Sequence, residues 1–230
     1  MKPWNKIPIY DSGEKIVSVP STIKLIDPHP YLKSGAPYKN KDLIWALRET
    51  VLLKLINADN YLKSNYKDLS LMLYDSWRPM EVQEYMYNSA INAEYQKLKI
   101  NSDEDKLKLS EEVCKKVGKF WAYPTQNPAC PPPHSTGAAI DATLINSNGK
   151  VIFMGSNFDE MSPRSSPDFY QKNNSREALL WKNRRQILKT VLMKFGFVQH
   201  PHEWWHFSYG DQLWAWKKQK PNALYGRVSY

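Results

Sequence analysis

Two short stretches that lie far apart in this 230-residue chain hold the side chains best suited to chemistry. The first contains His134 and Asp141, and the second contains Glu203 and His206. Catalytic zinc takes three nitrogen or oxygen ligands from a protein and keeps a fourth position for water. Two imidazoles and two carboxylates in apolar surroundings therefore predict a zinc site whose ligands come from these four residues.

Asp141 belongs to an apolar stretch, residues 139–145, that is typical of a buried strand. Alternation places Asp141 on the face opposite Ile140. A buried carboxylate is costly unless it is paired or binds a cation. Gly137 is a turn residue that accepts positive φ, so His134 can fold back toward Asp141. The alternative is an Asp141 bonded to backbone amides, with His134 on the surface.

The second stretch, residues 203–207, is short and aromatic, which favours a strand. Glu203 and His206 are three residues apart, and a regular strand would place them on opposite faces. Both can reach one metal only at a bulge or a strand end. His200 and His202 compete with His206 as ligands, and the alternative is an aromatic strand whose histidine binds no metal.

Apolar residues at helical spacing predict a helix over residues 42–64, followed by a buried strand over residues 69–74. A second helix is expected over residues 80–95. Arg78 therefore lies where a strand becomes a helix, a position from which a side chain can point into a cleft. Its alternative role is that of a surface ion-pair partner.

Further helices are expected over residues 102–117 and 175–195. Residues 151–153 are predicted to return as the antiparallel partner of the strand that carries Asp141. The long loop over residues 156–174 carries Asp159, whose alternative role is that of a helix cap. Helices that flank a small antiparallel sheet, with the zinc site in a central cleft, indicate an α+β fold.

The length of the chain predicts one domain over residues 1–230. Residues 1–41 are rich in proline, glycine and polar side chains and are expected to form an arm or lid over the core. His29 lies between two prolines, and we expect it on the surface rather than at a metal. The two cysteines, Cys114 and Cys130, are expected to be free thiols.

The net charge of +9 favours anionic surroundings, but the basic residues are scattered. Because no nucleic-acid-binding motif accompanies them, we expect no nucleic-acid partner. No apolar run approaches the roughly 18 residues of a membrane span. No secretory signal is visible, so the expected compartment is the cytoplasm. The oligomeric state is not predicted.

Four segments in order resemble motifs of the zinc peptidases that include the D-alanyl-D-alanine dipeptidases of the vancomycin-resistance type. Residues 132–141 resemble their S-x-H-x-x-G-x-A-x-D motif, and residues 203–206 resemble their E-x-x-H motif. Residues 75–79 resemble D-x-x-R-P, and residues 154–159 resemble M-G-x-x-F-D. The resemblance extends from about Tyr31 to the C-terminus and implies an α+β fold of the kind described above.

The resemblance implies one zinc ion per chain, held by His134, Asp141 and His206. It implies that Glu203 is the general base, which takes a proton from water and delivers it to the leaving amine. Arg78 would stabilise the developing oxyanion. His206 is preferred over its two neighbouring histidines because it alone follows a glutamate by three residues and matches the motif.

The resemblance also places Asp159 and Ser135 at the substrate, with Asp159 holding a free ammonium group. It implies a peptidoglycan-related metalloprotease that hydrolyses the small dipeptide D-alanyl-D-alanine to two D-alanines. Pro132 departs from the motif, which has serine there, and this puts the substrate contacts in doubt. The alternatives are a zinc D,D- or L,D-carboxypeptidase acting on longer wall peptides, and an idle binding module such as the related hedgehog signalling domain.

Overall fold

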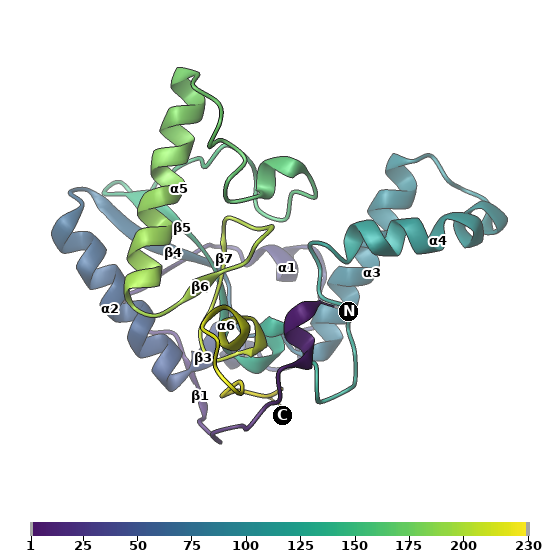
Figure 1. The fold of residues 1–230 in the computed structure, drawn as a ribbon, viewed down its shortest axis with the longest axis horizontal. Helices are drawn as coiled ribbons and strands as arrows, with labels where there is room; N and C mark the ends of the chain where they lie inside the picture. The colour runs from purple at the N-terminus through teal and green to yellow at the C-terminus, as the bar shows by residue number, and fades with distance from the viewer. Residues whose placement is uncertain (1, 229–230) are drawn as a thin grey trace.

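A five-stranded sheet with the strand order β2-β4-β5-β7-β6 forms the centre of the computed structural model, which describes residues 2–228 (Figure 1). Its strands are β2 (Lys24–Leu25), β4 (Leu69–Asp75), β5 (Ala139–Asn146), β6 (Val198–Gln199) and β7 (His206–Ser208). Only the edge pair β2–β4 is parallel, and the other three pairs are antiparallel. A separate antiparallel pair joins β1 (Ile16–Ser18) to β3 (Ala46–Arg48). The expected α+β fold is confirmed, with a mixed rather than purely antiparallel sheet.

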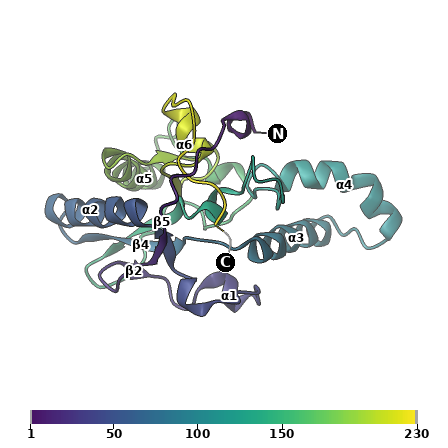
Figure 2. The same cartoon turned by 90° about the horizontal axis from the view of Figure 1, so that it is seen from below.

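The helices lie on both sides of this sheet. They are α1 (Pro30–Lys33), α2 (Glu49–Asn65), α3 (Met80–Lys97), α4 (Asp103–Val117), α5 (Arg176–Lys194) and α6 (Gln212–Lys217), with 3-10 turns η1 (Pro3–Lys6), η2 (Lys41–Leu43), η3 (Pro133–Thr136) and η4 (Pro163–Ser165). Helices α3 and α4 form a pair that extends away from the sheet (Figures 1 and 2). No helix within residues 2–228 is both long enough and apolar enough to cross a membrane.

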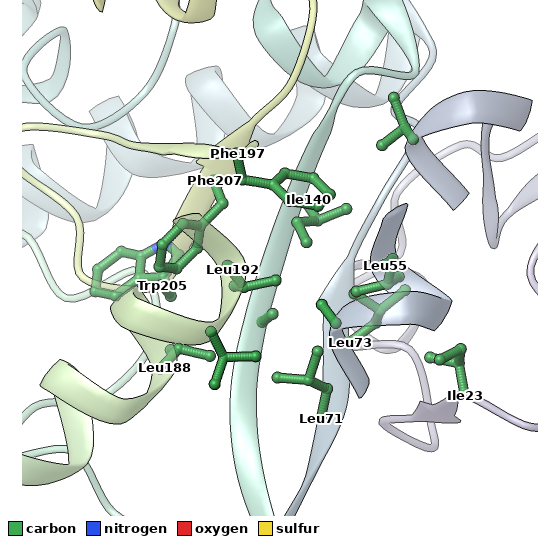
Figure 3. Close-up of a cluster of buried hydrophobic side chains, with 14 of the residues drawn as sticks. Ile23, Leu55, Leu71, Leu73, Ile140, Leu188, Leu192, Phe197, Trp205 and Phe207 are labelled. Carbon is green, nitrogen blue, oxygen red and sulfur yellow. The ribbon is translucent and has the colours of Figure 1, made fainter. Parts of the chain in front are cut away.

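The main core lies between the sheet and the helices α2 and α5. Leu188 and Leu192 of α5 pack toward Ile140 of β5 and Leu73 of β4 in one buried cluster (Figure 3). Because side chains alternate along a strand, Asp141 faces away from this cluster. One face of the sheet is therefore apolar, and the other is free to carry polar side chains.

The helix expected from residue 42 begins only at Glu49. Residues 46–48 form β3 instead, because Ala46, Leu47 and Arg48 pair with β1. Arg48 also donates its backbone N–H to the Gly137 carbonyl and its Nε to the Thr136 carbonyl, at 2.9 Å each. These long-range bonds outweigh the local helical periodicity and hold the turn that precedes β5.

The expected antiparallel return of residues 151–153 beside β5 forms only at its start. Val151 makes one antiparallel bridge to Ile145, and the Ile152 N–H donates to the Leu144 carbonyl at 2.9 Å, but Val151 and Phe153 are both exposed. Arg184 donates to the Phe153 carbonyl at 2.8 Å, so the chain turns toward α5 instead of continuing along β5. The other predicted helices lie close to their expected positions, and so does the strand that carries Asp141. Both cysteines are free thiols as expected.

His29 is buried, so the expectation that it lies on the surface was wrong. Its Nδ1 accepts a hydrogen bond from the Tyr31 backbone N–H at 3.2 Å, which caps α1. Its Nε2 lies 3.3 Å from Oδ1 of the buried Asp75. A neighbouring carboxylate compensates for burying the imidazole, which the flanking prolines could not indicate.

The buried guanidinium of Arg185 in α5 fixes the loop that carries Asp159. It donates to the backbone carbonyls of Met154, Arg164 and Ser166 at 2.7 to 2.8 Å. The segment between these carbonyls is thereby held against α5, although it contains no strand.

We predict that Arg185→Met lowers the free energy of unfolding by about 2–4 kcal/mol, because it leaves several buried carbonyls without donors. Urea unfolding monitored by circular dichroism is the measurement. Arg184→Met is the matched control, since Arg184 makes one bond at an exposed site and should cost less than about 1 kcal/mol. Equal losses for both variants would contradict the anchoring role.

Candidate active site

Three neighbouring strands place polar side chains in one row across the sheet. Asp75 of β4 pairs with Asp141 of β5, and Asp141 pairs with His206 of β7. A register shift between Leu73 and Asp75 precedes the row and lets Asp75 take this position. The polar face of the sheet therefore presents two carboxylates and one imidazole side by side.

His134 reaches this row from η3, which ends at Gly137 with a φ of 71°. The positive φ predicted for this glycine is confirmed. A Cβ at residue 137 would also lie 2.8 Å from Ile16 Cγ2, so only glycine fits the tight turn. The turn folds His134 back toward Asp141.

His134, Asp141 and His206 form one buried cluster. His134 Nε2 lies 3.1 Å from His206 Nδ1 and 3.3 Å from Asp141 Oδ2. His206 Nδ1 lies 3.1 Å from Asp141 Oδ1. Two ring nitrogens and a carboxylate thus converge on one point.

The hydrogen bonds on the outer side of the rings show which nitrogens can bind a metal. His134 Nδ1 lies 2.7 Å from the Ser76 carbonyl, which can only accept, so Nδ1 carries the proton and Nε2 offers its lone pair. His206 Nε2 lies 3.2 Å from Ser208 Oγ, which leaves Nδ1 for the cluster. Such outer bonds are typical of metal-ligating histidines.

The charge of the cluster fits a cation. Burial would raise the pKa of Asp141, but His134 and His206 hold that pKa well below its ordinary value, so the carboxylate is ionised. The unprotonated ring nitrogens of His134 and His206 and the Asp141 carboxylate are all electron-pair donors, and none of them can donate a proton to the others. A divalent cation between them would bind all three groups. The donor types, one oxygen and two imidazole nitrogens, suit zinc.

Arg78 lies beside the cluster and is buried, which excludes the alternative of a surface ion pair. Its Nε and Nη2 both donate to Asp75 Oδ2, at 3.0 and 2.5 Å. Nη1 donates to Gln83 Oε1 at 2.8 Å, and Nη2 lies 3.9 Å from Asp141 Oδ2. These contacts hold the guanidinium in one orientation at the edge of the cleft.

Glu203 lies in the turn before β7 rather than in a strand. The expected strand over residues 203–207 begins only at His206, so the two side chains are not forced onto opposite faces. The Glu203 carboxylate lies 3.7 Å from His206 Nδ1 and 3.6 Å from His200 Nδ1. Burial, together with the negative charge of Asp141, raises the pKa of Glu203 to about 8.

Asp159 is partly buried and lies on the other side of Arg78. Its Oδ2 accepts a hydrogen bond from the Tyr31 hydroxyl at 3.0 Å, and that hydroxyl accepts one from Arg78 Nη2 at 3.2 Å. Burial and the negative charge of Asp141 raise the pKa of Asp159 to about 7. A cationic ligand beside Asp159 would favour the ionised carboxylate.

A small cleft with a volume of about 40 Å³ opens over these side chains. Its wall includes Arg78, His134, Asp141, Asp159, His200, Glu203 and His206, together with Lys2, Gln83, Phe120, Trp121, Ala122, Pro133 and Trp205. A cavity of this size admits only a few water molecules.

Ser135 does not line this cleft. Its hydroxyl faces Met80 Sδ at 3.5 Å, and its backbone carbonyl accepts from the Val228 N–H. The 3-10 turn directs the side chains of His134 and Ser135 differently, and the contact of Ser135 with the substrate stays a prediction. Of the competing histidines, His200 lies beside Glu203, while His202 is not part of the cluster.

Sequence reasoning did not single out Asp75 or Tyr31. Asp75 was visible as the first residue of the D-x-x-R-P segment, directly after a predicted buried strand. Tyr31 gave no such signal, because it reaches Asp159 across 128 residues of sequence. Its role follows only from the tertiary structure.

Comparison with known proteins identifies the family. A model of the M15 peptidases, described as D-ala-D-ala dipeptidase, matches residues 37–223. The chain belongs to this family. A D-alanyl-D-alanine dipeptidase of Synechocystis sp. is 35% identical over 237 residues, which cover 100% of this chain and 96% of that protein. A second, from Escherichia coli, is 27% identical over 175 residues, covering 74% of this chain and 65% of that protein.

Among solved structures, the LdcB LD-carboxypeptidase covers 92% of this chain and 76% of its own, with a TM-score of 0.46 and 13% identity. Peptidases of the M15 family use zinc, and the cluster of His134, Asp141 and His206 fits that metal.

We predict that His134→Ala and His206→Ala each lose the bound zinc, because each removes one of three ligands. Metal content is measured by atomic absorption after gel filtration, with circular dichroism to verify folding. His202→Ala is the matched control and should retain one zinc per chain, since His202 lies outside the cluster. Full zinc in both folded ligand variants would refute the ligand assignment.

Proposed function

We propose that this protein hydrolyses D-alanyl-D-alanine to two molecules of D-alanine at the zinc site. The observation that supports this most strongly is that three kinds of chemical group line one small cleft. A metal cluster, a buried acid at Glu203 and a fixed guanidinium at Arg78 all line it. These are the groups that peptide hydrolysis needs, and the family is one of dipeptidases.

Proton transfer is assigned to Glu203. Zinc, when bound, polarises a carbonyl and makes water acidic enough to be deprotonated near neutral pH. Glu203 lies beside the ligand His206, so its carboxylate can take the proton of the attacking water. It then delivers that proton to the amine of the departing D-alanine, and its raised pKa is suited to both steps.

Stabilisation of the developing oxyanion is assigned to Arg78. The guanidinium is held by Asp75 and Gln83, so it does not need to reorganise when negative charge develops on the scissile carbonyl oxygen. Asp75 thereby has a positioning role, because it touches Arg78 at two donors.

Recognition of the substrate ammonium is assigned to Asp159 and Tyr31. The carboxylate of Asp159 accepts from the Tyr31 hydroxyl and has capacity for further donors. A free amino terminus would supply a positive charge at this place. A peptide extended at its amino end would instead bring an uncharged amide and additional bulk, so the site favours a dipeptide.

The carboxypeptidase alternative requires that longer wall peptides pass Asp159. The Asp159 carboxylate in the wall of the cleft suits a free ammonium group and favours the dipeptide instead. The presence of both Glu203 and Arg78 in the cleft argues against an idle binding module. The cytoplasmic location expected from the sequence stays a prediction.

We predict that Glu203→Gln keeps the zinc but lowers kcat on D-alanyl-D-alanine by about 10²–10⁴-fold, because it removes the proton acceptor. Release of free D-alanine by the zinc-loaded protein is the measurement, and metal content is determined on the same sample. A variant with near-normal kcat would remove Glu203 from the mechanism.

We predict that N-acetyl-D-alanyl-D-alanine is cleaved about a hundredfold less efficiently than the free dipeptide. Acetylation removes the ammonium charge and leaves Asp159 without its partner, and each tenfold loss corresponds to about 1.4 kcal/mol. The ratio of kcat/KM values for the two substrates is the measurement. Asp159→Ala should bring the two kcat/KM values closer together by slowing cleavage of the free dipeptide more. Equal kcat/KM values for the two substrates in the wild-type protein would favour the carboxypeptidase alternative.

A further inference from the structure

The N-terminal turn η1 brings a lysine to the wall of the catalytic cleft. Lys2 precedes η1 and lines the cleft together with Glu203 and His200. Trp4 of the same turn is buried and packs edge-on against His200, with ring centroids 5.7 Å apart. The start of the chain is therefore packed against a residue that touches the catalytic acid.

Further contacts hold η1 in this position. The buried side chain of Gln212 in α6 donates to the carbonyls of Ile7 and Ala129, at 2.6 and 2.9 Å. Trp4 also packs against Trp216, with ring centroids 5.6 Å apart. These contacts link η1 to α6 and to the loop before His134, so Lys2 is presented by a structured segment.

Two separate series of contacts lead away from the metal ligands. One runs from Asp141 through Arg78 and Tyr31 to Asp159. The other runs from His206 through Glu203 and His200 to Trp4 of η1. Figure 2 shows α1, which carries Tyr31, and the N-terminal turn on opposite sides of the strand β5. Asp159 and Lys2 thus belong to opposite ends of the site.

The polarity of a dipeptide matches this arrangement of charges. With its ammonium at Asp159 and its scissile carbonyl at the metal cluster, its carboxylate extends toward the second end. Arg78 is held by Asp75 and Gln83 at the place assigned to the scissile carbonyl oxygen. Among residues 2–228, by contrast, no carboxylate forms an ion pair with Lys2. An adjoining cavity of about 610 Å³ is lined by both Lys2 and Pro132. Pro132 has no backbone N–H that could donate to a substrate carboxylate.

We propose that Lys2 binds the C-terminal carboxylate of the dipeptide substrate and is a specificity-determining residue of this enzyme. The inference rests on the proposed dipeptidase function. The Lys2 ammonium lies over the ring of Trp4, 5.5 Å from its centroid, and Trp4 in turn packs against His200. Lys2, Ala122 and Pro133 are shared by the cleft and the adjoining cavity, and a carboxylate bound by Lys2 would mark the end of the substrate.

The test compares D-alanyl-D-alanine with its C-terminal amide, using protein with an unmodified N-terminus. Lys2→Met should lower kcat/KM for the free acid about 10–100-fold more than for the amide, because only the acid loses a charged partner, whereas the altered field at Glu203 affects both substrates. Lys2→Arg should restore part of the preference. Lys6→Met is the matched control, since it removes an exposed charge of the same turn and should change neither rate. An unchanged acid-to-amide ratio, or faster cleavage of the acid, in Lys2→Met would overturn the proposal.

Equilibrium binding separates this inference from the proposed function. Zinc-loaded Glu203→Gln protein, with and without Lys2→Met, is titrated with the dipeptide and with its amide by calorimetry. The added substitution should weaken binding of the acid by about tenfold or more and leave the amide unaffected. If wild-type protein fails to cleave the dipeptide, the proposed function fails, while this titration still decides the role of Lys2. Equal affinities for the acid in both proteins, or no binding at all, would contradict the Lys2 assignment.

Discussion

The buried carboxylate of Asp141 is the constraint on which the rest of the site depends. A charge in the middle of a sheet is costly unless opposite charges and hydrogen-bond donors surround it. His134 from the turn before β5 and His206 from β7 supply such donors to its two oxygens, while the register of β4 places Asp75 on its other side. Asp75 adds a second negative charge, which Arg78 balances with two donors to one oxygen. The same pairings that close the sheet therefore create a site with a strong preference for a cation.

This arrangement also separates two acids of the same cleft by their surroundings. Asp141 faces two imidazoles, and its pKa is held well below its ordinary value. Glu203 is buried near the negative charge of Asp141, and its pKa rises to about 8. One carboxylate stays ionised and can bind a metal, while the other can hold or release a proton near neutral pH. The difference comes from position alone, because both side chains carry the same functional group.

The sequence predicted those features that depend on local pattern. The apolar run around Asp141 indicated a buried strand, and Gly137 indicated a turn that reverses the chain before it. Sequence could not predict β3, since its pairing with β1 depends on residues about thirty positions earlier and overrides a helical periodicity. Nor could it place Glu203, because an aromatic run favours a strand whereas the chain turns there. The role of Tyr31 could not be predicted because its partner, Asp159, is 128 residues away in the sequence.

Segments near both termini of the described chain pack together beside the site. Tyr10 and Ser12 near the start donate backbone hydrogen bonds to the carbonyls of residues 223 and 224 near the end. The Val228 N–H reaches the carbonyl of Ser135, the residue next to a metal ligand. The metal ligands themselves come from the interior strands and the turn before β5. Metal binding and the proposed recognition of the substrate carboxylate therefore depend on different parts of the structure.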